Sequence, residues 1–290
     1  MNEPNTTAVK KKNKFAEVWK RLCKNTGAVI GMIIILIFVL GAVFANLIRP
    51  YDLVIRQEAA IRLDPPSAEH WFGTDAYGRD VFARVLYGSR ISLSIGFFTA
   101  AFSLIFGGIL GAAGAYYGGQ VDNIIMRVMD LLFAFPSILL AMLVIAMLGV
   151  NTFNTMLAIS IWSVPSFARM VRGRALQVKE EDYIMATRSL GAKDSRILLH
   201  ILKNCLPVII VIATMRMATS IISISTLSYL GMGVTPPQPE WGGMIASAKS
   251  FMWERPSLIF VPGAAVMLTV ICFNVLGDKL RDILDPSLKD

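Results

Sequence analysis

Long apolar runs separated by shorter polar connections dominate this chain of 290 residues. A helix needs roughly 20 apolar residues to cross the hydrocarbon core of a bilayer, and several of the runs have that length. We expect membrane spans at residues 27–48, 89–117, 123–149, 152–167, 206–230 and 258–276. The pattern therefore predicts an all-α polytopic membrane protein with six transmembrane helices.

One connection, residues 169–206, is unusually long and densely charged for a turn between two spans. Gly191 is placed to end a first helix within it, and Asp194 to cap a second one. In the first helix, four residues recur at helical spacing and would share one face: Tyr183, Ala186, Thr187 and Leu190. We interpret this helix–glycine–helix elbow as a surface that another protein grips.

The distribution of charge sets the expected orientation in the membrane. The net charge is +8, and lysine and arginine gather in residues 1–26 and in the polar connection. Basic segments stay on the cytoplasmic side, so both termini and the elbow are expected there, with residues 49–88 outside. The segment 15–22 either forms an amphipathic helix on the membrane surface or only orients the chain. A nucleic-acid partner is not expected, because no aromatic-interleaved basic groove accompanies the charge.

The residues for catalysis or metal binding are sparse. The chain holds three cysteines, far apart in sequence, and two histidines, which give no metal-ligand spacing. No Gly-x-x-x-x-Gly-Lys-Ser/Thr phosphate cradle and no hydrolase motif occurs. We therefore expect a non-catalytic chain that holds no metal and binds no cofactor of its own.

The fifth apolar run is unusually polar. Arg216 lies inside it, and an ionisable residue at that depth is costly and usually functional. This would fit an ion-coupled secondary transporter, but no intramembrane acid accompanies the arginine, which could instead be structural. Hydroxyls of the same run could line a path for a peptide or could bond neighbouring helices. The path candidates are Arg216, Ser220, Ser223 and Thr226.

The elbow resembles the EAA loop of permeases in ATP-binding-cassette (ABC) importers. In that family a Glu-Ala-Ala triplet is followed four residues later by glycine. Here the triplet positions are Met185-Ala186-Thr187, and the glycine is Gly191. Two of the three triplet residues therefore depart from the family pattern, and the proline expected near Lys203 comes later, at Pro207.

Other stretches are similar to the peptide/nickel branch of that family, in particular to its C-type permease subunit. They include HWFGTDAYGRDVFARVLYGSRISL, GAYYGGQVDNIIMRVMDLLFAFPSILLA and LSYLGMGVTPPQPEWGGM, and the similarity extends from about residue 27 to residue 286. The resemblance implies a type I importer permease with a five-helix core and one additional N-terminal helix. The implied organisation is a cytoplasmic tail (1–26), a first span with its external loop (27–88), a permease core containing the coupling loop (89–277) and a second cytoplasmic tail (278–290).

The same resemblance implies partners and a location. A homologous second permease subunit, two cytoplasmic ATPases that use ATP and Mg²⁺, and an extracytoplasmic solute-binding protein would complete an importer in the bacterial cytoplasmic membrane. The implied substrates are dipeptides, oligopeptides or glutathione, with nickel as the alternative within the family.

The resemblance also assigns residues. The loop that would contact the ATPases comprises Glu181, Asp182, Tyr183, Met185, Ala186, Thr187, Arg188, Leu190 and Gly191. An external motif comprises Gly73, Thr74, Asp75, Gly78, Arg79 and Asp80, which either touches the solute-binding protein or staples an external loop. Trp241 is expected to be an anchor at the membrane interface rather than a ligand contact.

Overall fold

The computed structural model describes residues 14–284, and within them regular structure is helical apart from one isolated β-bridge, Thr74–Asp80. Four helices are long and apolar enough to cross a membrane: α2 (Thr26–Val43), α5 (Val81–Tyr117), α10 (Asp194–Tyr229) and α12 (Ser257–Leu284). The pair α6 (Gly119–Ala134) and α7 (Ser137–Leu148) forms a fifth candidate if it is taken as one broken span. The all-α polytopic fold is confirmed.

The remaining predicted span lies in α8 (Thr152–Lys179), which is long enough but does not reach the hydropathy of the others. Its amino-terminal half carries several hydroxyl and amide side chains, which lower the mean hydropathy. The count of six spans therefore stays a prediction.

Four helices between residues 14 and 284 are longer than a bilayer requires: α5, α8, α10 and α12. With 37 residues at about 1.5 Å each, α5 is roughly 55 Å long, against a hydrocarbon thickness of about 30 Å. The helices α8 and α10 also continue beyond their apolar runs. As a result, the polar segment 169–206 consists largely of the ends of these two helices, with the short α9 (Asp182–Ser189) between them.

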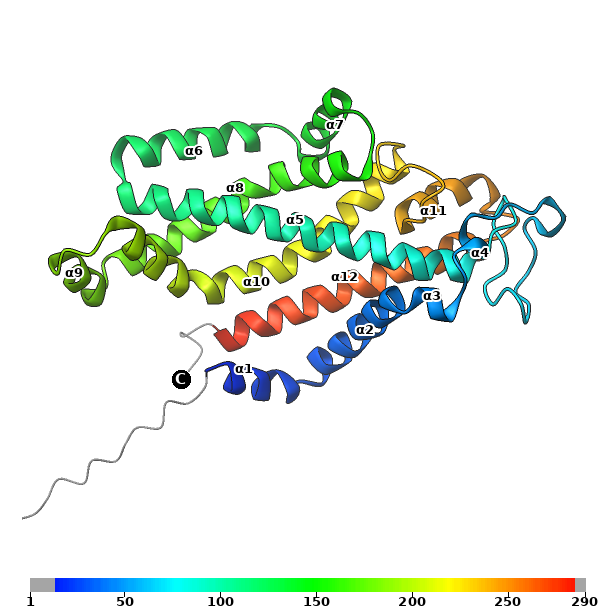
Figure 1. Cartoon of the computed structure of the whole chain (residues 1–290), viewed down its shortest axis with the longest axis horizontal. Helices are drawn as coiled ribbons and strands as arrows, with labels where there is room; N and C mark the ends of the chain where they lie inside the picture. The colour runs from blue at the N-terminus through cyan, green and yellow to red at the C-terminus, as the bar shows by residue number, and fades with distance from the viewer. Residues whose placement is uncertain (1–13, 285–290) are drawn as a thin grey trace, which may run out of the picture.

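The core is organised around α5, which packs against α2, α8 and α10. In Figure 1 the long helices lie side by side, with α6 along one flank and α2 along the other. Glycines on α5 allow a close approach to α8, because a Cβ added at Gly111 would lie 2.3 Å from the carbonyl oxygen of Ala168. This is the small-residue packing that membrane helices favour.

The third predicted span is not one helix. The axes of α6 and α7 differ by 94°, and the break falls at Phe135 and Pro136. Proline cannot donate a backbone hydrogen bond, and it disfavours a helical conformation in the residue before it. Phe135 accordingly adopts an extended conformation, and the chain turns there.

The two ends of the bundle differ in character. At one end lies α9; at the other lie α3 (Ala45–Ile48), α4 (Asp52–Ile55), η1 (Ala59–Ile61), α11 (Trp241–Ala248) and η2 (Lys249–Phe251) (Figure 1). The expectation for Trp241 was wrong. This residue is buried at the base of α11, and its indole N–H donates to the carbonyl oxygen of Val85 at 3.0 Å.

An N-terminal helix, α1 (Lys14–Cys23), confirms the helical expectation for segment 15–22. It packs against α12, and Leu22 is buried with Ala28 and Leu276. Its placement on a membrane surface stays a prediction. The lysine-rich residues before position 14 and the last residues of the C-terminal tail lie outside the described part of the chain.

Candidate functional site

The elbow between α8 and α10 has the helix–glycine–helix form that the sequence predicts. The helix α9 ends at Ser189, Gly191 follows with a φ of +75°, and α10 begins at Asp194. The N–H of Gly191 donates to the carbonyl oxygen of Arg188 at 2.9 Å. A positive φ of this kind is readily adopted by glycine and is typical of a residue that terminates a helix.

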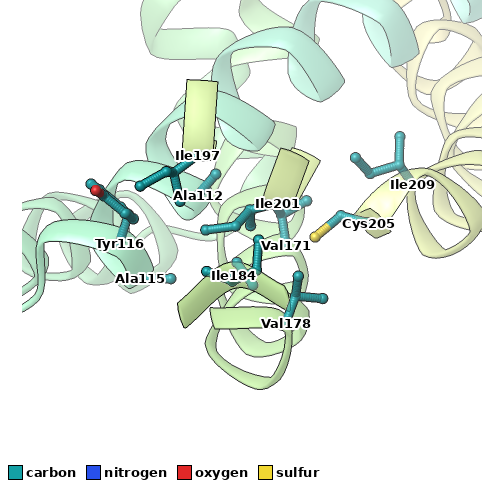
Figure 2. Packing of buried hydrophobic residues seen from close by; sticks show 11 residues of the cluster. Ala112, Ala115, Tyr116, Val171, Val178, Ile184, Ile197, Ile201, Cys205 and Ile209 are labelled. Atoms are coloured by element: carbon teal, nitrogen blue, oxygen red, sulfur yellow. The ribbon is translucent and has the colours of Figure 1, made fainter. Parts of the chain in front are cut away.

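A buried apolar cluster holds the elbow on the ends of the long helices. Ile184 is the buried residue of α9, and its side chain packs with Val178 of α8 and with Ile197 and Ile201 of α10. Figure 2 shows this cluster, to which α5 adds Ala112, Ala115 and Tyr116. Because one short helix contributes a single buried anchor to a core shared by three long helices, α9 is expected to move with them as a unit.

Polar contacts join α8 to α5 and to α6. Lys179, at the end of α8, donates to the terminal carbonyl oxygens of α5 at Ala115 (3.0 Å) and Tyr116 (2.9 Å). A basic side chain in this position satisfies carbonyls that the helix itself leaves unpaired. Arg172 of α8 also donates from Nε to the Asp122 carboxylate of α6 at 2.6 Å.

Asp194 does not cap α10 as predicted. Lys193 occupies the cap position and makes no side-chain cap bond, while the Asp194 carboxylate accepts the Tyr116 hydroxyl at 2.7 Å. The carboxylate therefore ties the first turn of α10 to the end of α5. It still lies in that first turn, where the helix dipole favours negative charge.

The rest of α9 faces outward. Leu190 is 87% exposed and Met185 and Tyr183 are about half exposed, although all three are large and apolar or aromatic. Ala186 between them is also exposed, and Glu181 and Asp182 flank this surface at the start of the helix. We call the exposed surface formed by Tyr183, Met185, Ala186 and Leu190 the α9 face. An exposed apolar surface with acidic residues at its start suits a contact with another protein.

The other predicted loop residues have roles within the elbow. The Thr187 hydroxyl donates to the carbonyl oxygen of Tyr183 at 2.6 Å, and the guanidinium of Arg188 lies 5.2 Å from the centre of the Tyr116 ring. Partial burial, followed by the nearby Glu181 carboxylate, raises the pKa of Tyr183. Like any tyrosine phenol at neutral pH, it is protonated and is available as a hydrogen-bond donor.

The predicted path residues of α10 do not all lie on one surface. Ser220 is buried within the chain, and its hydroxyl has no partner among the described residues. Ser223 and Thr226 are partly exposed, and their hydroxyls donate to the carbonyl oxygens of Thr219 and Ile222 of the same helix, each at 2.9 Å. Arg216 lies on the same side of the helix and contacts α8. Ser220 is thus buried, whereas the other three are partly exposed.

The external motif forms a compact stapled loop. The Asp75 carboxylate accepts the Arg79 Nε at 2.8 Å, and the Asp80 carboxylate caps α5 through the Ala83 N–H at 2.6 Å. Thr74, Arg79 and Asp80 are buried. Gly73 and Gly78 have positive φ values, and a Cβ added at Gly78 would lie 2.0 Å from the Glu58 carbonyl oxygen. This geometry favours the stapling interpretation over a contact with a second protein.

Several structural residues of the elbow escaped the sequence analysis, notably Ile184, Tyr116 and Lys179. Ile184 lies between two residues assigned to the exposed face, and helical spacing places it on the side of α9 opposite Ala186. Tyr116 and Lys179 come from helices that were expected to end near the membrane. Their roles depend on contacts between distant segments, which no local pattern encodes.

Metal binding receives no support from the described residues. Between positions 14 and 284 no group of three or more histidine, cysteine, aspartate or glutamate side chains is placed to hold an ion. The three cysteines are free, with Cys23 exposed and Cys205 and Cys272 buried.

Comparison with known proteins identifies the class. Residues 91–290 match the family "binding-protein-dependent transport system inner membrane component", and residues 13–66 match the N-terminal transmembrane domain of oligopeptide transport permease C. The chain therefore belongs to the binding-protein-dependent transport permease family, whose members are type I ABC permeases. The second match agrees with the resemblance to C-type subunits.

The chain is also similar to individual permeases of dipeptide and glutathione transport systems. The chain is 45% identical over 276 residues to the dipeptide transport system permease protein DppC of Alkalihalophilus pseudofirmus, covering 95% of this chain and 90% of the relative. It is 44% identical over 276 residues to the glutathione transport system permease protein GsiD of Pectobacterium atrosepticum, covering 95% and 92%. It is also 44% identical over 274 residues to GsiD of Escherichia coli, covering 94% and 90%.

Proposed function

We propose that this chain is the transmembrane permease subunit of an ATP-driven importer of dipeptides, oligopeptides or glutathione. The main structural support is the α9 face, an exposed apolar surface on a short helix that is anchored to the ends of α5, α8 and α10. The names of the relatives support a peptide-like substrate and do not favour the nickel alternative.

The importer would contain a homologous second permease, two cytoplasmic ATPases and an extracytoplasmic solute-binding protein. ATP and Mg²⁺ would be used by the ATPases, and this chain would be non-catalytic. By the positive-inside rule, the basic tail and the basic elbow support the proposal that both termini lie on the cytoplasmic side of a bacterial inner membrane.

The mechanism follows from the way the elbow is attached. When the ATPases close on ATP, a partner that grips the α9 face displaces α9, and Ile184 transmits this displacement to the buried cluster. Packed interiors transmit strain rather than absorb it, so the inner ends of α5, α8 and α10 are moved together. This displacement would switch the permease pair between outward- and inward-open states.

The path is proposed to run along the exposed side of α10, between the two permease subunits. Arg216, Ser223 and Thr226 share this side, whereas buried Ser220 would act in packing. The external motif is proposed to brace the outer ends of α4, α5 and α11. Arg84 of α5 supports this role, because its Nε lies 3.5 Å from the Asp75 carboxylate of the motif. Its guanidinium also donates to the carbonyl oxygens of Val54 in α4 (2.8 Å) and of Pro237 in the segment before α11 (3.4 Å).

Uptake by a reconstituted complex tests the function and separates it from an ion-coupled transporter. The complete complex is placed in proteoliposomes with the binding protein outside, and uptake of a labelled dipeptide is followed. We expect uptake that requires ATP and both ATPases and that persists when proton and sodium gradients are collapsed. Uptake by the permease chains alone, driven by an ion gradient, would refute the proposal.

A further inference from the structure

Arg216 lies at the middle of a membrane-spanning helix. It follows the start of the apolar run 206–230 by 10 residues, or roughly 15 Å, and it is the only charged residue of that run. A charge at that depth is costly and is usually directed toward a protein interior or a water-filled path. The position therefore calls for a specific partner.

The partners of Arg216 within the chain do not neutralise it. Its guanidinium donates to the Ser166 hydroxyl of α8 and lies 5.7 Å from the centre of the Trp162 ring. None of the ion pairs found across residues 14–284 involves Arg216. A hydroxyl and an aromatic face support the cation and leave it able to bind an anion.

The side of α10 that carries Arg216 is polar beyond this residue. Thr219, Ser223 and Thr226 follow at intervals of three and four residues, and Thr219 is exposed. Their hydroxyls donate within the helix, to the carbonyl oxygens of Arg216 (3.0 Å), Thr219 (2.9 Å) and Ile222 (2.9 Å). Their lone pairs are left to accept hydrogen bonds, a surface that suits a wet path better than lipid.

This arrangement suits the carboxylate and the backbone N–H groups of a peptide. Arg216 is a fixed donor for a carboxylate, and the hydroxyls on its outer side can accept from peptide N–H groups. We propose that Arg216, supported by Ser166 and Trp162, is a carboxylate-binding station halfway along the path, which the C-terminal carboxylate of the peptide occupies during transport. The proposal rests on the proposed function and assigns part of the substrate selection to the permease itself.

The test compares a peptide acid with its amide in the complete reconstituted importer. Uptake of a tripeptide with a free C-terminal carboxylate and of the same tripeptide as C-terminal amide is measured for wild type, Arg216→Gln, Arg216→Lys and the control Thr214→Val. The binding protein is the same in every complex, so its own preference cancels. Losing a charge-assisted hydrogen bond should lower the acid-to-amide ratio about tenfold or more in Arg216→Gln. Lysine should preserve much of the ratio, and Thr214→Val all of it.

A second measurement decides the matter where the amide is not taken up at all. Arg216→Cys is made together with Cys23→Ser, which removes the exposed native cysteine. The new thiol is then treated with aminoethyl or sulfonatoethyl methanethiosulfonate. Restoring a positive charge should recover uptake of the peptide acid several-fold, whereas adding a negative charge should not.

Two results would overturn the station: an unchanged acid-to-amide ratio in Arg216→Gln, or equal effects of the two reagents. If either result is found while wild-type uptake still depends on ATP, the carboxylate-binding role of Arg216 is contradicted and the proposed function is not. Wild-type complex without ATP-dependent uptake would instead contradict the proposed function.

Discussion

Ile184 and Leu190 show how one short helix serves two contacts. Ile184 is 1% exposed and anchors α9 in the buried cluster, whereas Leu190 is 87% exposed at the other side. The two departures from the family triplet fit this division. Met185 adds apolar surface to the α9 face, and Thr187 places its hydroxyl on the carbonyl oxygen of Tyr183, so no polar atom is left unpaired. Both substitutions preserve an exposed helix that another protein can grip.

Gly191 gives a prediction at this scale. Its φ of +75° costs a β-branched residue roughly 1–2 kcal/mol, although open space surrounds it. We expect Gly191→Val and Gly191→Pro to reduce ATP-dependent uptake strongly while the complex still assembles. Proline has a second effect, because it removes the N–H that donates to the Arg188 carbonyl oxygen. Gly191→Asn should retain most uptake, since asparagine tolerates this conformation.

The measurement is peptide uptake per ATP hydrolysed in proteoliposomes. Gly231→Val is the matched control, because Gly231 has a φ of +79° and open surroundings. It also follows the last residue of α10 by two positions, as Gly191 follows the last residue of α9. Equal losses in Gly191→Val and Gly191→Asn would show that the bend itself is not what matters.

At the scale of elements, glycines let the backbones of α5 and α8 approach each other closely. Gly107 and Gly111 bring the helices together, and a Cβ at Gly107 would lie 2.7 Å from the Val164 carbonyl oxygen. Neither neighbouring atom belongs to a flexible side chain that could withdraw. The joint matters for coupling because α8 leads directly into α9, whereas α5 contributes to the cluster under it.

A pair of alanine substitutions tests this joint. Gly111→Ala forces a methyl group against the α8 backbone and should destabilise the subunit by about 1–3 kcal/mol through overpacking. Gly108→Ala meets nothing within 4 Å and should be neutral or stabilising, since alanine is the better helix former. Thermal unfolding of the purified complex in detergent measures both changes, and an equal response of the two variants would contradict the packing described here.

At the scale of the whole molecule, the apolar runs predict the helices but not their true ends or their bends. Hydropathy marks what lies in lipid, so it misses that α8 and α10 continue into water and carry the elbow between them. The turn between α6 and α7 depends on Phe135 leaving the helical region, which the sequence indicates only through Pro136. The burial of Trp241 and the bond from Tyr116 to Asp194 required helices distant in sequence to be placed side by side.

The exposed residues of the candidate site could be predicted from the sequence, but the residues that anchor it could not. Gly191 and the exposed α9 residues follow from helical spacing and from the family resemblance. Ile184, Lys179 and Tyr116 do not follow from a motif, because their role is to hold the elbow rather than to display a surface. Sequence therefore indicates which residues the elbow exposes, and the structure adds how the elbow is connected to the long helices.

Photo-crosslinking from the α9 face tests the central claim most directly. Benzoylphenylalanine is introduced at Leu190 in the assembled importer. The control is Trp253, which is 91% exposed and belongs to the segment that follows α11 and η2. In Figure 1, α11 and α9 lie at opposite ends of the bundle. The account predicts a crosslinked product between this chain and an ATPase from position 190 and none from position 253. An assembled complex in which position 190 crosslinks only to lipid or to another permease chain would contradict it.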